Sequence, residues 1–557
     1  MFFTALSGCF LLVVAWLVYT LFIQPLFSPL RNLPGPDARK GIIGLGGHLN
    51  LVLNASLSKT THEGFVAIYG RNMRIKGLGN FEDRLLSTDP AVISYVLNHT
   101  NEYQKPWQSR RVIARLIGEG LLASEGEMHK RMRRVSSPAF SSHNLSDLMH
   151  IAMNKAYELR DKWFTMLDEP QAGTEVRVDD ATKIDVCHWI SRSAFDVIGL
   201  AGFDYDFSAI QNEENELFLA YRNMFEIVVS RGETLWDIVC IYFPWLELLL
   251  PNEKTRTVQR SQKIINSIGG QLIEERKLRL ADSEKQNKTG HRNSDVLSLL
   301  IKSNFSSETP PSQRLSDEEV LANVNTYFFA GSDTTSLTLT WILYLLAMHP
   351  EVQDRLRAEL YTLPKEISRM PTINENDDWR HLWKDIDELP YLNNVVRETL
   401  RLISPLHSSI RVAMKDDEIP TSDAIKMRDG SVHHGIKIKK GQFVHIPVES
   451  MNLDKTVWGE DAWNFNPDRW DNLPDAVLEQ PGLYNHTLSF SAGPRSCIGM
   501  KFSLTVIKDF LYVLLCNFAF APAKNDRVYA RNTVLMRPYV SGKLMEGSQC
   551  PLMVTRV

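Results

Sequence analysis

A long stretch without proline, from Ser316 to Pro350, is the feature that most constrains the fold of this chain. Glu319 follows Ser316 at the spacing of a capping box, in which the two side chains satisfy backbone N–H groups at a helix N-terminus. Because no proline interrupts the stretch, we expect a helix of about 32 residues, about 48 Å long at about 1.5 Å per residue. Such a helix crosses a whole globular domain, so the rest of the fold is expected to pack around it.

The middle of this helix carries the segment Ala330-Gly331-Ser332-Asp333-Thr334-Thr335. Small residues thin a helix and let a flat ring lie against it, whereas Asp and Thr are poor helix formers. A local rule broken in this way often marks a functional position. The alternative is a packing notch in which a Thr hydroxyl bonds back to its own helix.

A second informative segment runs from Phe490 to Gly499 and delivers Cys497 to the start of an apolar helical stretch, 500–515. A helix N-terminus favours the thiolate, so we expect a lowered thiol pKa. Zinc needs about four protein ligands, and a single sulfur is a poor zinc site. One sulfur does suit haem, in which the porphyrin supplies four nitrogens. The alternative is a small buried Cys after a turn.

Composition narrows the class of protein. The chain has 557 residues, of which 44% are hydrophobic, and a net charge of -4, so nothing global indicates nucleic-acid binding. Its six cysteines are scattered without a C-x-x-C pair, which indicates a reduced, cytosol-facing protein rather than a disulfide scaffold.

The N-terminus predicts a membrane anchor. Residues 1–30 contain no charged side chain, and 2–23 is apolar enough to cross about 30 Å of hydrocarbon. The first charges follow this segment, which places the N-terminus in the lumen and the remainder in the cytosol. A cleaved signal peptide is the alternative, although the segment lacks a basic n-region. We expect residues 31–50, with Leu33-Pro34-Gly35-Pro36, to form a Pro/Gly-rich hinge.

The Cys497 segment matches F-x-x-G-x-R-x-C-x-G without a gap, and the chain thereby resembles the cytochrome P-450 family of haem-thiolate monooxygenases. The A-G-x-D-T-T segment, the E-x-x-R at Glu398 and the F-x-P-x-R-W at 465–470 are similar to further motifs of this family, in the family's order. The resemblance covers nearly the whole chain after the anchor. It implies a mainly α fold of about a dozen helices with a small β-rich lobe, and 51–557 as the catalytic haem domain.

The resemblance also implies roles for particular residues. Cys497 would be the axial ligand of the haem iron, and Thr334 and Asp333 would deliver protons. Glu398, Arg401 and Arg469 would form a buried charge cluster that supports the haem loop. His129 departs from the family, which has Trp at this position. The other residues expected to contact the cofactor, heme b (iron protoporphyrin IX), are Arg495, Arg133, His129, Arg411, Phe490, Gly493, Gly499, Ala330 and Gly331.

The implied reaction inserts one oxygen atom from O2 into a lipophilic small molecule, such as a terpenoid-like biosynthetic intermediate. Electrons would come from NADPH-cytochrome P-450 reductase, docked on Lys130, Arg131 and Arg134. The implied location is the endoplasmic reticulum membrane, with a single span and a cytosolic catalytic domain. A haem-thiolate isomerase or dehydratase, and a haem carrier or gas sensor, remain as alternatives. We expect the substrate to lie among the apolar residues Tyr327, Phe328, Leu406, Ile410 and Leu535.

Overall fold

The structure, a computed structural model, describes residues 15, 18–19, 23–37, 47–77, 82–168, 181–230, 235–285, 295–305, 310–363 and 376–557. These residues fall into two compact units, each built from separated parts of the chain. Unit 1 comprises Met1–Pro106, Leu406–Asn464 and Leu473–Ser496, and unit 2 comprises Trp107–Pro405, Phe465–Asn472 and Cys497–Val557. Unit 2 is mainly helical and unit 1 holds the larger sheet, so the fold is mainly α with small sheets, as predicted.

Unit 2 is built from long helices and two small sheets, in the strand orders β4-β12-β9 and β10-β11. Its helices and strands are α5 (Trp107–Ile117), α6 (Gly126–Ser136), α7 (Ser142–Asp168), β4 (Thr182–Asp185), α8 (Val186–Phe203), α9 (Glu216–Ser230), α10 (Leu235–Tyr242), α11 (Trp245–Leu249), α12 (Glu253–Lys285), α13 (Val296–Phe305), α14 (Asp317–Met348), α15 (Pro350–Leu360), α16 (Asn376–Glu388), α17 (Pro390–Leu402), α21 (Met500–Asn517), β9 (Phe518–Pro522), β10 (Val528–Asn532), β11 (Met536–Val540) and β12 (Pro551–Arg556).

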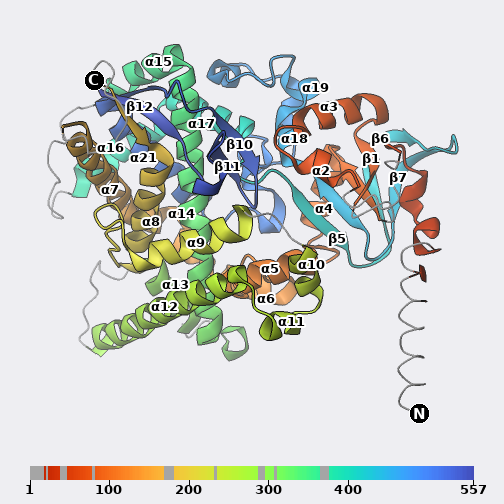
Figure 1. Cartoon of the computed structure of the whole chain (residues 1–557), viewed down its shortest axis with the longest axis horizontal. Helices are drawn as coiled ribbons and strands as arrows, with labels where there is room; N and C mark the ends of the chain where they lie inside the picture. Colours follow the sequence, from red (N-terminus) through yellow and green to blue (C-terminus); the bar gives the residue numbers. More distant parts are fainter. Residues whose placement is uncertain are drawn as a thin grey trace. The chain divides into compact units, whose positions relative to one another are not determined.

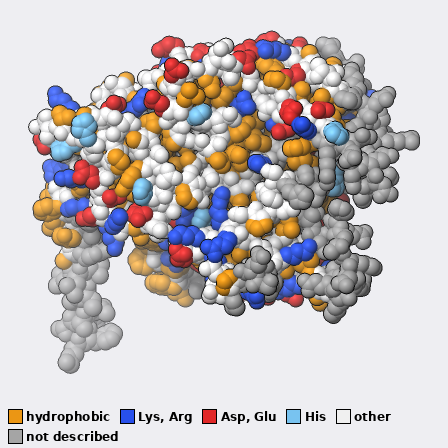
Figure 2. All heavy atoms as spheres, turned by 180° about the vertical axis from the view of Figure 1, so that it is seen from behind, with side chains coloured by type: hydrophobic (Ala, Val, Ile, Leu, Met, Phe, Trp, Pro, Cys, Tyr) orange, Lys and Arg blue, Asp and Glu red, His pale blue; other side chains and the backbone are white. Residues whose placement is uncertain are grey.

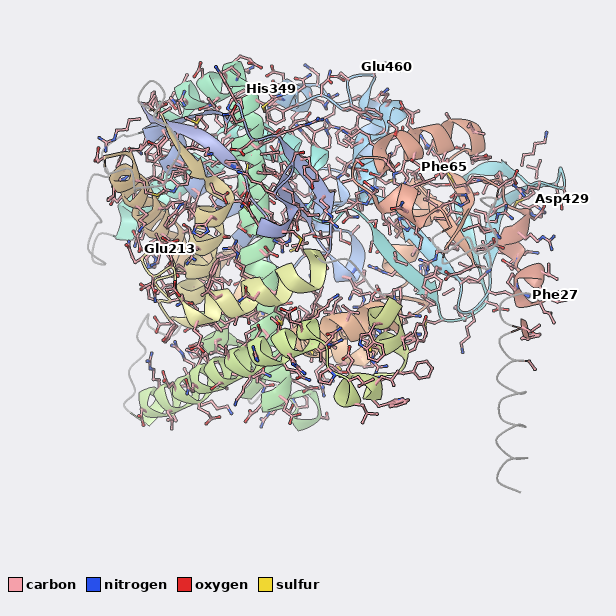
Figure 3. All side chains as sticks on the ribbon, viewed as in Figure 1. Phe27, Phe65, Glu213, His349, Asp429 and Glu460 are labelled. Carbon is pink, nitrogen blue, oxygen red and sulfur yellow. The ribbon has the colours of Figure 1, made fainter. Side chains whose placement is uncertain are left out.

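The helix α14 confirms the prediction made from its proline-free sequence. The Ser316 hydroxyl accepts from the Glu319 N–H at 3.2 Å, and the Glu319 carboxylate accepts from the Ser316 N–H at 2.9 Å, which completes the capping box. The helix has 32 residues and ends before His349, labelled in Figure 3, because Pro350 begins α15. α14 packs against α8, α21 and β9, so it is the central helix of unit 2 (Figure 1).

Gly331 has a packing role on α14. A Cβ at this position would lie 2.8 Å from Cδ1 of Ile198 on α8, so the absence of a side chain lets the two helices approach closely. The thin part of α14 therefore accommodates a neighbouring helix, in line with the packing notch that was the alternative for this segment.

Unit 1 contains a five-stranded sheet in the order β1-β2-β8-β5-β3. β2 and β8 are parallel, with Arg84 opposite Phe443, and β5 and β8 are antiparallel, with Arg411 opposite Val444. A separate hairpin pairs β6 with β7. The elements of unit 1 are α2 (Leu49–Leu53), α3 (Ser58–Tyr69), β1 (Asn72–Lys76), β2 (Asp83–Ser87), α4 (Pro90–Asn98), β3 (Tyr103–Gln104), β5 (Ser409–Ala413), β6 (Asp417–Lys426), β7 (Val432–Ile438), β8 (Phe443–Ile446), α18 (Val448–Leu453), α19 (Lys455–Trp458) and α20 (Asp475–Leu478).

The end of the predicted anchor (Leu30) and the start of the predicted hinge (Leu33) are both part of unit 1. Leu30 and Leu33 are buried in its hydrophobic core, and the Arg74 N–H on β1 donates to the Pro34 carbonyl at 2.8 Å. This stretch therefore belongs to the folded unit, because its leucines supply apolar area that the sheet needs to cover. Residues 38–46 of the hinge lie outside the described residues.

The predicted anchor, residues 1–30, lies mostly outside the described residues. Among the helices that the structure does describe, none combines the length and the apolar character needed to cross a membrane.

Candidate functional site

Cys497 lies in unit 2, three residues before α21, with Gly499 as the N-cap of that helix. Its side chain is exposed, yet the surrounding protein desolvates the thiolate and raises the pKa of Cys497 above its ordinary value. The Gly499 N–H and the Arg133 guanidinium oppose this rise without reversing it. Our expectation of a lowered thiol pKa was therefore wrong, because desolvation outweighs the helix N-terminus.

The helix α6 places His129 and Arg133 one turn apart on a single face. His129 is buried and Arg133 is half-buried. Burial lowers the pKa of Arg133, while the Cys497 sulfur raises it, so the guanidinium and the sulfur are within electrostatic reach of each other. The structure thus brings Arg133 and Cys497 together.

A face of α14 points toward the same region of unit 2. Tyr327 donates its hydroxyl proton to Ser136 and stacks edge-on against Phe140, with ring centroids 5.4 Å apart. Phe140 lies 3.9 Å from the position of a Cβ on Gly499. Thr334 follows Tyr327 by two helical turns and shares its face, as does Ala330.

The Thr334 hydroxyl donates to the Ala330 carbonyl at 2.6 Å, the back-bonded geometry that the sequence left open. Thr335 instead contacts the Ser503 hydroxyl of α21 at 3.0 Å and ties the two helices together. The two adjacent threonines therefore do different things, and only Thr334 lies on the face shared with Tyr327.

Asp333 forms an ion pair with Arg537 of β11. The side chains are 19% and 9% exposed, so the pair is largely withdrawn from solvent. Both residues line a cavity of about 70 Å³ between α8, α9 and α14. We did not predict Arg537, and no sequence signal relates a strand residue to an acid more than one hundred positions away.

Four predicted cofactor residues belong to unit 1. Phe490 is buried and packs edge-on against Tyr484, with ring centroids 5.5 Å apart. Gly493 has φ 69°, and a Cβ there would lie 2.7 Å from the Leu97 carbonyl oxygen, so the turn excludes larger residues.

The two arginines among these four predicted residues lie on different elements. Arg495 ends the 3-10 turn Gly493–Arg495. The Arg411 guanidinium donates to the Ser409 hydroxyl at 2.7 Å on β5. Both side chains offer the planar fork that suits a carboxylate.

The structure brings Glu398, Arg401 and Arg469 into one buried cluster in unit 2. Arg401 makes two hydrogen bonds to the Glu398 carboxylate, at 2.7 and 2.9 Å, and both side chains are 0% exposed. The Arg469 Nε lies 3.5 Å from the same carboxylate, and the Trp470 indole N–H donates to it at 3.1 Å. The Trp470 contact was not predicted, although Trp470 stands inside the quoted motif.

The structure also places several residues that we expected to line the substrate pocket or to bind the reductase. Phe328 stacks on Phe203 at 4.1 Å inside an aromatic core with α8 and α9, so it packs the helices together. Leu535 is also buried, whereas Leu406 is exposed. Arg131 pairs with Glu319, and Lys130 pairs with Glu127 at 2.7 Å.

The residues of unit 2 fit a haem. In the described parts of the chain, no group of three or more His, Cys, Asp or Glu side chains is arranged to hold a metal ion. An exposed single thiol near an arginine matches a group that brings its own four nitrogens and carries carboxylates for a basic partner.

The fold and this donor set define a haem-thiolate protein. A family model described as Cytochrome P-450 matches residues 69–544, and the chain belongs to this family. It is a cytochrome P-450 monooxygenase that uses heme b (iron protoporphyrin IX).

Three relatives are informative. Cytochrome P-450 monooxygenase 205 of Postia placenta is 37% identical over 98% of this chain and 96% of its own length. Cytochrome P-450 monooxygenase 128 of the same fungus is 36% identical over 97% and 96%. Ganoderic acid synthetase of Ganoderma lucidum is 30% identical over 91% and 90%.

Proposed function

We propose that this chain inserts one oxygen atom from O2 into a lipophilic, terpenoid-like small molecule, with Cys497 as the sulfur ligand of the haem iron. The observation that carries the proposal is the arrangement in unit 2. There Cys497 lies within electrostatic reach of Arg133, and Thr334 lies on the face of α14 that contacts Phe140 beside Gly499.

When bound, the haem supplies the redox chemistry that activates dioxygen. The chain's own residues handle charge and protons. Arg133 would pair with a propionate. Thr334 would hold a proton at its hydroxyl on the site face of α14, and Asp333 would pass protons to it from the neighbouring face.

The substrate class is supported by one relative, whose name connects it with ganoderic acid. Membranes that carry this protein are incubated with NADPH and a panel of terpenoids, steroids and fatty acids under ¹⁸O2. A product with one labelled oxygen is expected. A product formed without O2 would instead indicate an isomerase or dehydratase, and CO binding without any product would indicate a carrier or gas sensor.

Membrane attachment is part of the proposal, with residues 1–30 as the anchor at the endoplasmic reticulum. A second feature supports it. In unit 2, α10 and α11 expose a run of large apolar side chains: Tyr242, Phe243, Trp245, Leu249 and Leu250. Aromatic side chains of this kind partition into membrane interfaces. Deletion of residues 1–23, which removes the apolar segment and spares the buried Leu30, is expected to release much of the protein from membranes while haem still binds. If the truncated protein takes up no haem, anchor and catalytic domain are not separable.

The electron donor is proposed to be NADPH-cytochrome P-450 reductase, docked on α6. Figure 2 shows both basic and acidic side chains on the face that it draws. Lys130 and Arg134 are exposed, while Arg131 is partly withdrawn by its pairing with Glu319. Replacing Lys130 and Arg134 with Gln should slow iron reduction and flatten its dependence on salt. The same replacement of the exposed Lys384 is the control.

A further inference from the structure

One face of α14 forms a wall of the cavity beside Asp333. Its α14 lining residues are Phe329, Ser332, Asp333, Ser336 and Leu337. These positions recur every three or four residues, so they form one face of the helix. The opposite wall comes from α8 and α9, through residues that include His188 and Arg222.

Thr334 lies on a different face of α14 from the cavity. Its hydroxyl bonds to Ala330, and Ala330 and Tyr327 share its face. Asp333 is adjacent to Thr334 in the chain but lines the cavity. The Asp333 carboxylate is therefore the acidic group that stands between the cavity and the Thr334 face.

Arg537 determines how this carboxylate is held. Burial disfavours the charge on Arg537, yet the ion pair with Asp333 outweighs burial and raises the pKa of the guanidinium. Arg537 therefore stays charged and keeps the carboxylate directed into the cavity that it also lines. A charged, hydrogen-bonded partner restricts the orientation of the carboxylate. A solvent-exposed acid would have no such restriction.

We propose that Arg537 is the positioning residue for Asp333, and that the cavity both side chains line supplies the water from which Asp333 takes its protons. The inference rests on the proposed function. In each transfer, the Asp333 carboxylate accepts a proton from cavity water and passes it to the Thr334 hydroxyl. Solvent replaces that proton, and the carboxylate returns to its charged state beside Arg537.

One lining residue of the cavity, His188, contacts a residue at the protein surface. The His188 Nε2 lies 3.2 Å from the carboxylate of Glu213, an exposed residue labelled in Figure 3. Burial, together with Arg192 and Arg222, lowers the pKa of His188 to about 4. At neutral pH its imidazole is uncharged, so one ring nitrogen accepts a hydrogen bond while the other donates.

The first test compares Arg537→Gln, which removes the charge, with Arg537→Lys, which keeps it. Arg537→Gln is expected to lower product per NADPH several-fold, to raise peroxide to match, and to increase the solvent deuterium isotope effect on product formation. Arg537→Lys is expected to restore much of the coupling. The matched control is Arg531→Gln on β10, directly opposite Arg537 in the sheet and not among the residues that line the cavity. If Arg537→Gln behaves like Arg531→Gln in these measurements, the inference is overturned.

The second test changes the cavity and leaves the ion pair intact. Ser191 lines the cavity from α8, so Ser191→Leu fills space that Ser191→Ala leaves open. Ser191→Leu should increase the isotope effect and Ser191→Ala should not. Equal behaviour of the two variants would exclude the cavity as the source of protons, even if Arg537→Gln fails to fold.

The third measurement needs no turnover. Thermal unfolding of Asp333→Asn, Arg537→Gln and the double variant forms a double-mutant cycle, and a directly paired acid and base give non-additive losses. Additive losses would contradict the pairing. A wild-type protein that forms no oxygenated product would refute the proposed function, whereas a wild type that turns over normally alongside an unaffected Arg537→Gln would refute only this inference.

Discussion

The Thr334 hydroxyl donates to the carbonyl oxygen of Ala330, one turn earlier on α14, at 2.6 Å. The bond fixes the direction of the hydroxyl and leaves its oxygen able to accept from another donor. This geometry is compatible both with a purely structural role of Thr334 and with a role in proton delivery. Removing the hydroxyl distinguishes the two roles.

Thr334→Ala removes this hydroxyl with little change in volume. We expect the haem spectrum to stay normal and NADPH still to be consumed, while product per NADPH falls several-fold and peroxide rises, because protons no longer arrive in order. The matched control is Thr338→Ala, which loses an equivalent bond to the Thr334 carbonyl at 2.9 Å. If Thr334→Ala stays as well coupled as Thr338→Ala, the Thr334 hydroxyl serves packing alone.

Cys497→Ser removes the proposed sulfur ligand. The reduced, CO-bound spectrum should lose the absorption band of thiolate-ligated haem, and turnover should be lost, because a serine oxygen donates less electron density to iron. Cys516→Ser, near the other end of α21, is the control and should keep both. A Cys497→Ser protein that retained the band would assign the ligand elsewhere.

Glu398→Gln removes the carboxylate that the buried side chains of Arg401 and Arg469 share. Removing one partner of a buried charge pair costs about 3–5 kcal/mol, so we expect a loss of that order in the free energy of unfolding, measured by denaturant titration. Glu388→Gln is the control, since Glu388 and Lys384 are each 66% exposed at 3.8 Å and such pairs contribute about 0–1 kcal/mol. Equal losses from the two variants would show that burial does not govern the cluster.

Acid should destabilise unit 1 through a buried group of histidines around Glu449. Glu449 accepts from Ser58 at 2.5 Å and lies 3.1 Å from His407, and the His62 ring centroid is 6.3 Å from that of His407. Neither ring nitrogen of His62 finds a hydrogen-bond partner among the described residues, and burial lowers its pKa to about 4. Burial, together with neighbouring cations and imidazoles, also holds the pKa of His445 well below its ordinary value.

The sign of the effect follows from His62. Its pKa is lower in the folded state than in the unfolded state, so the unfolded chain binds more protons between about pH 6.5 and 4. The stability due to neutral His62 is fully present above that window and is lost as pH falls through it, by about 3 kcal/mol. Unfolding measured against pH should show this loss in the wild type and in His434→Gln, an exposed control on β7, but less in His62→Gln. An unchanged pH profile for His62→Gln would remove His62 as the cause.

Local rules in the sequence were sufficient for α14. A capping box and a proline specify where a helix begins and ends, because both act through backbone hydrogen bonds of neighbouring residues. The same reasoning missed the burial of Leu30 and Leu33, which depends on a sheet assembled from distant strands.

The parts of the candidate site that lie within one short sequence motif were predictable. Glu398 and Arg401 are three residues apart on one helix, so their pairing follows from helical geometry. Arg537 was not predictable, because its partner Asp333 is brought to it only by the packing of β11 near α14. The direction of the Cys497 pKa shift also depends on desolvation by the folded chain, which a local motif does not specify.

The parallel pairing of β2 with β8 has a consequence for synthesis of the protein. Arg84 pairs with Phe443, so the N-terminal strands emerge from the ribosome long before the strand that completes their sheet. At about 5–20 residues per second, that interval lasts roughly 20–70 s, during which the edge of β2 stays open to other strands. A pause or early stop in translation between these two points would therefore leave a nascent chain in which β2 has β1 on one edge and no native partner on the other. Faster elongation should shorten the period in which chaperones must cover that edge.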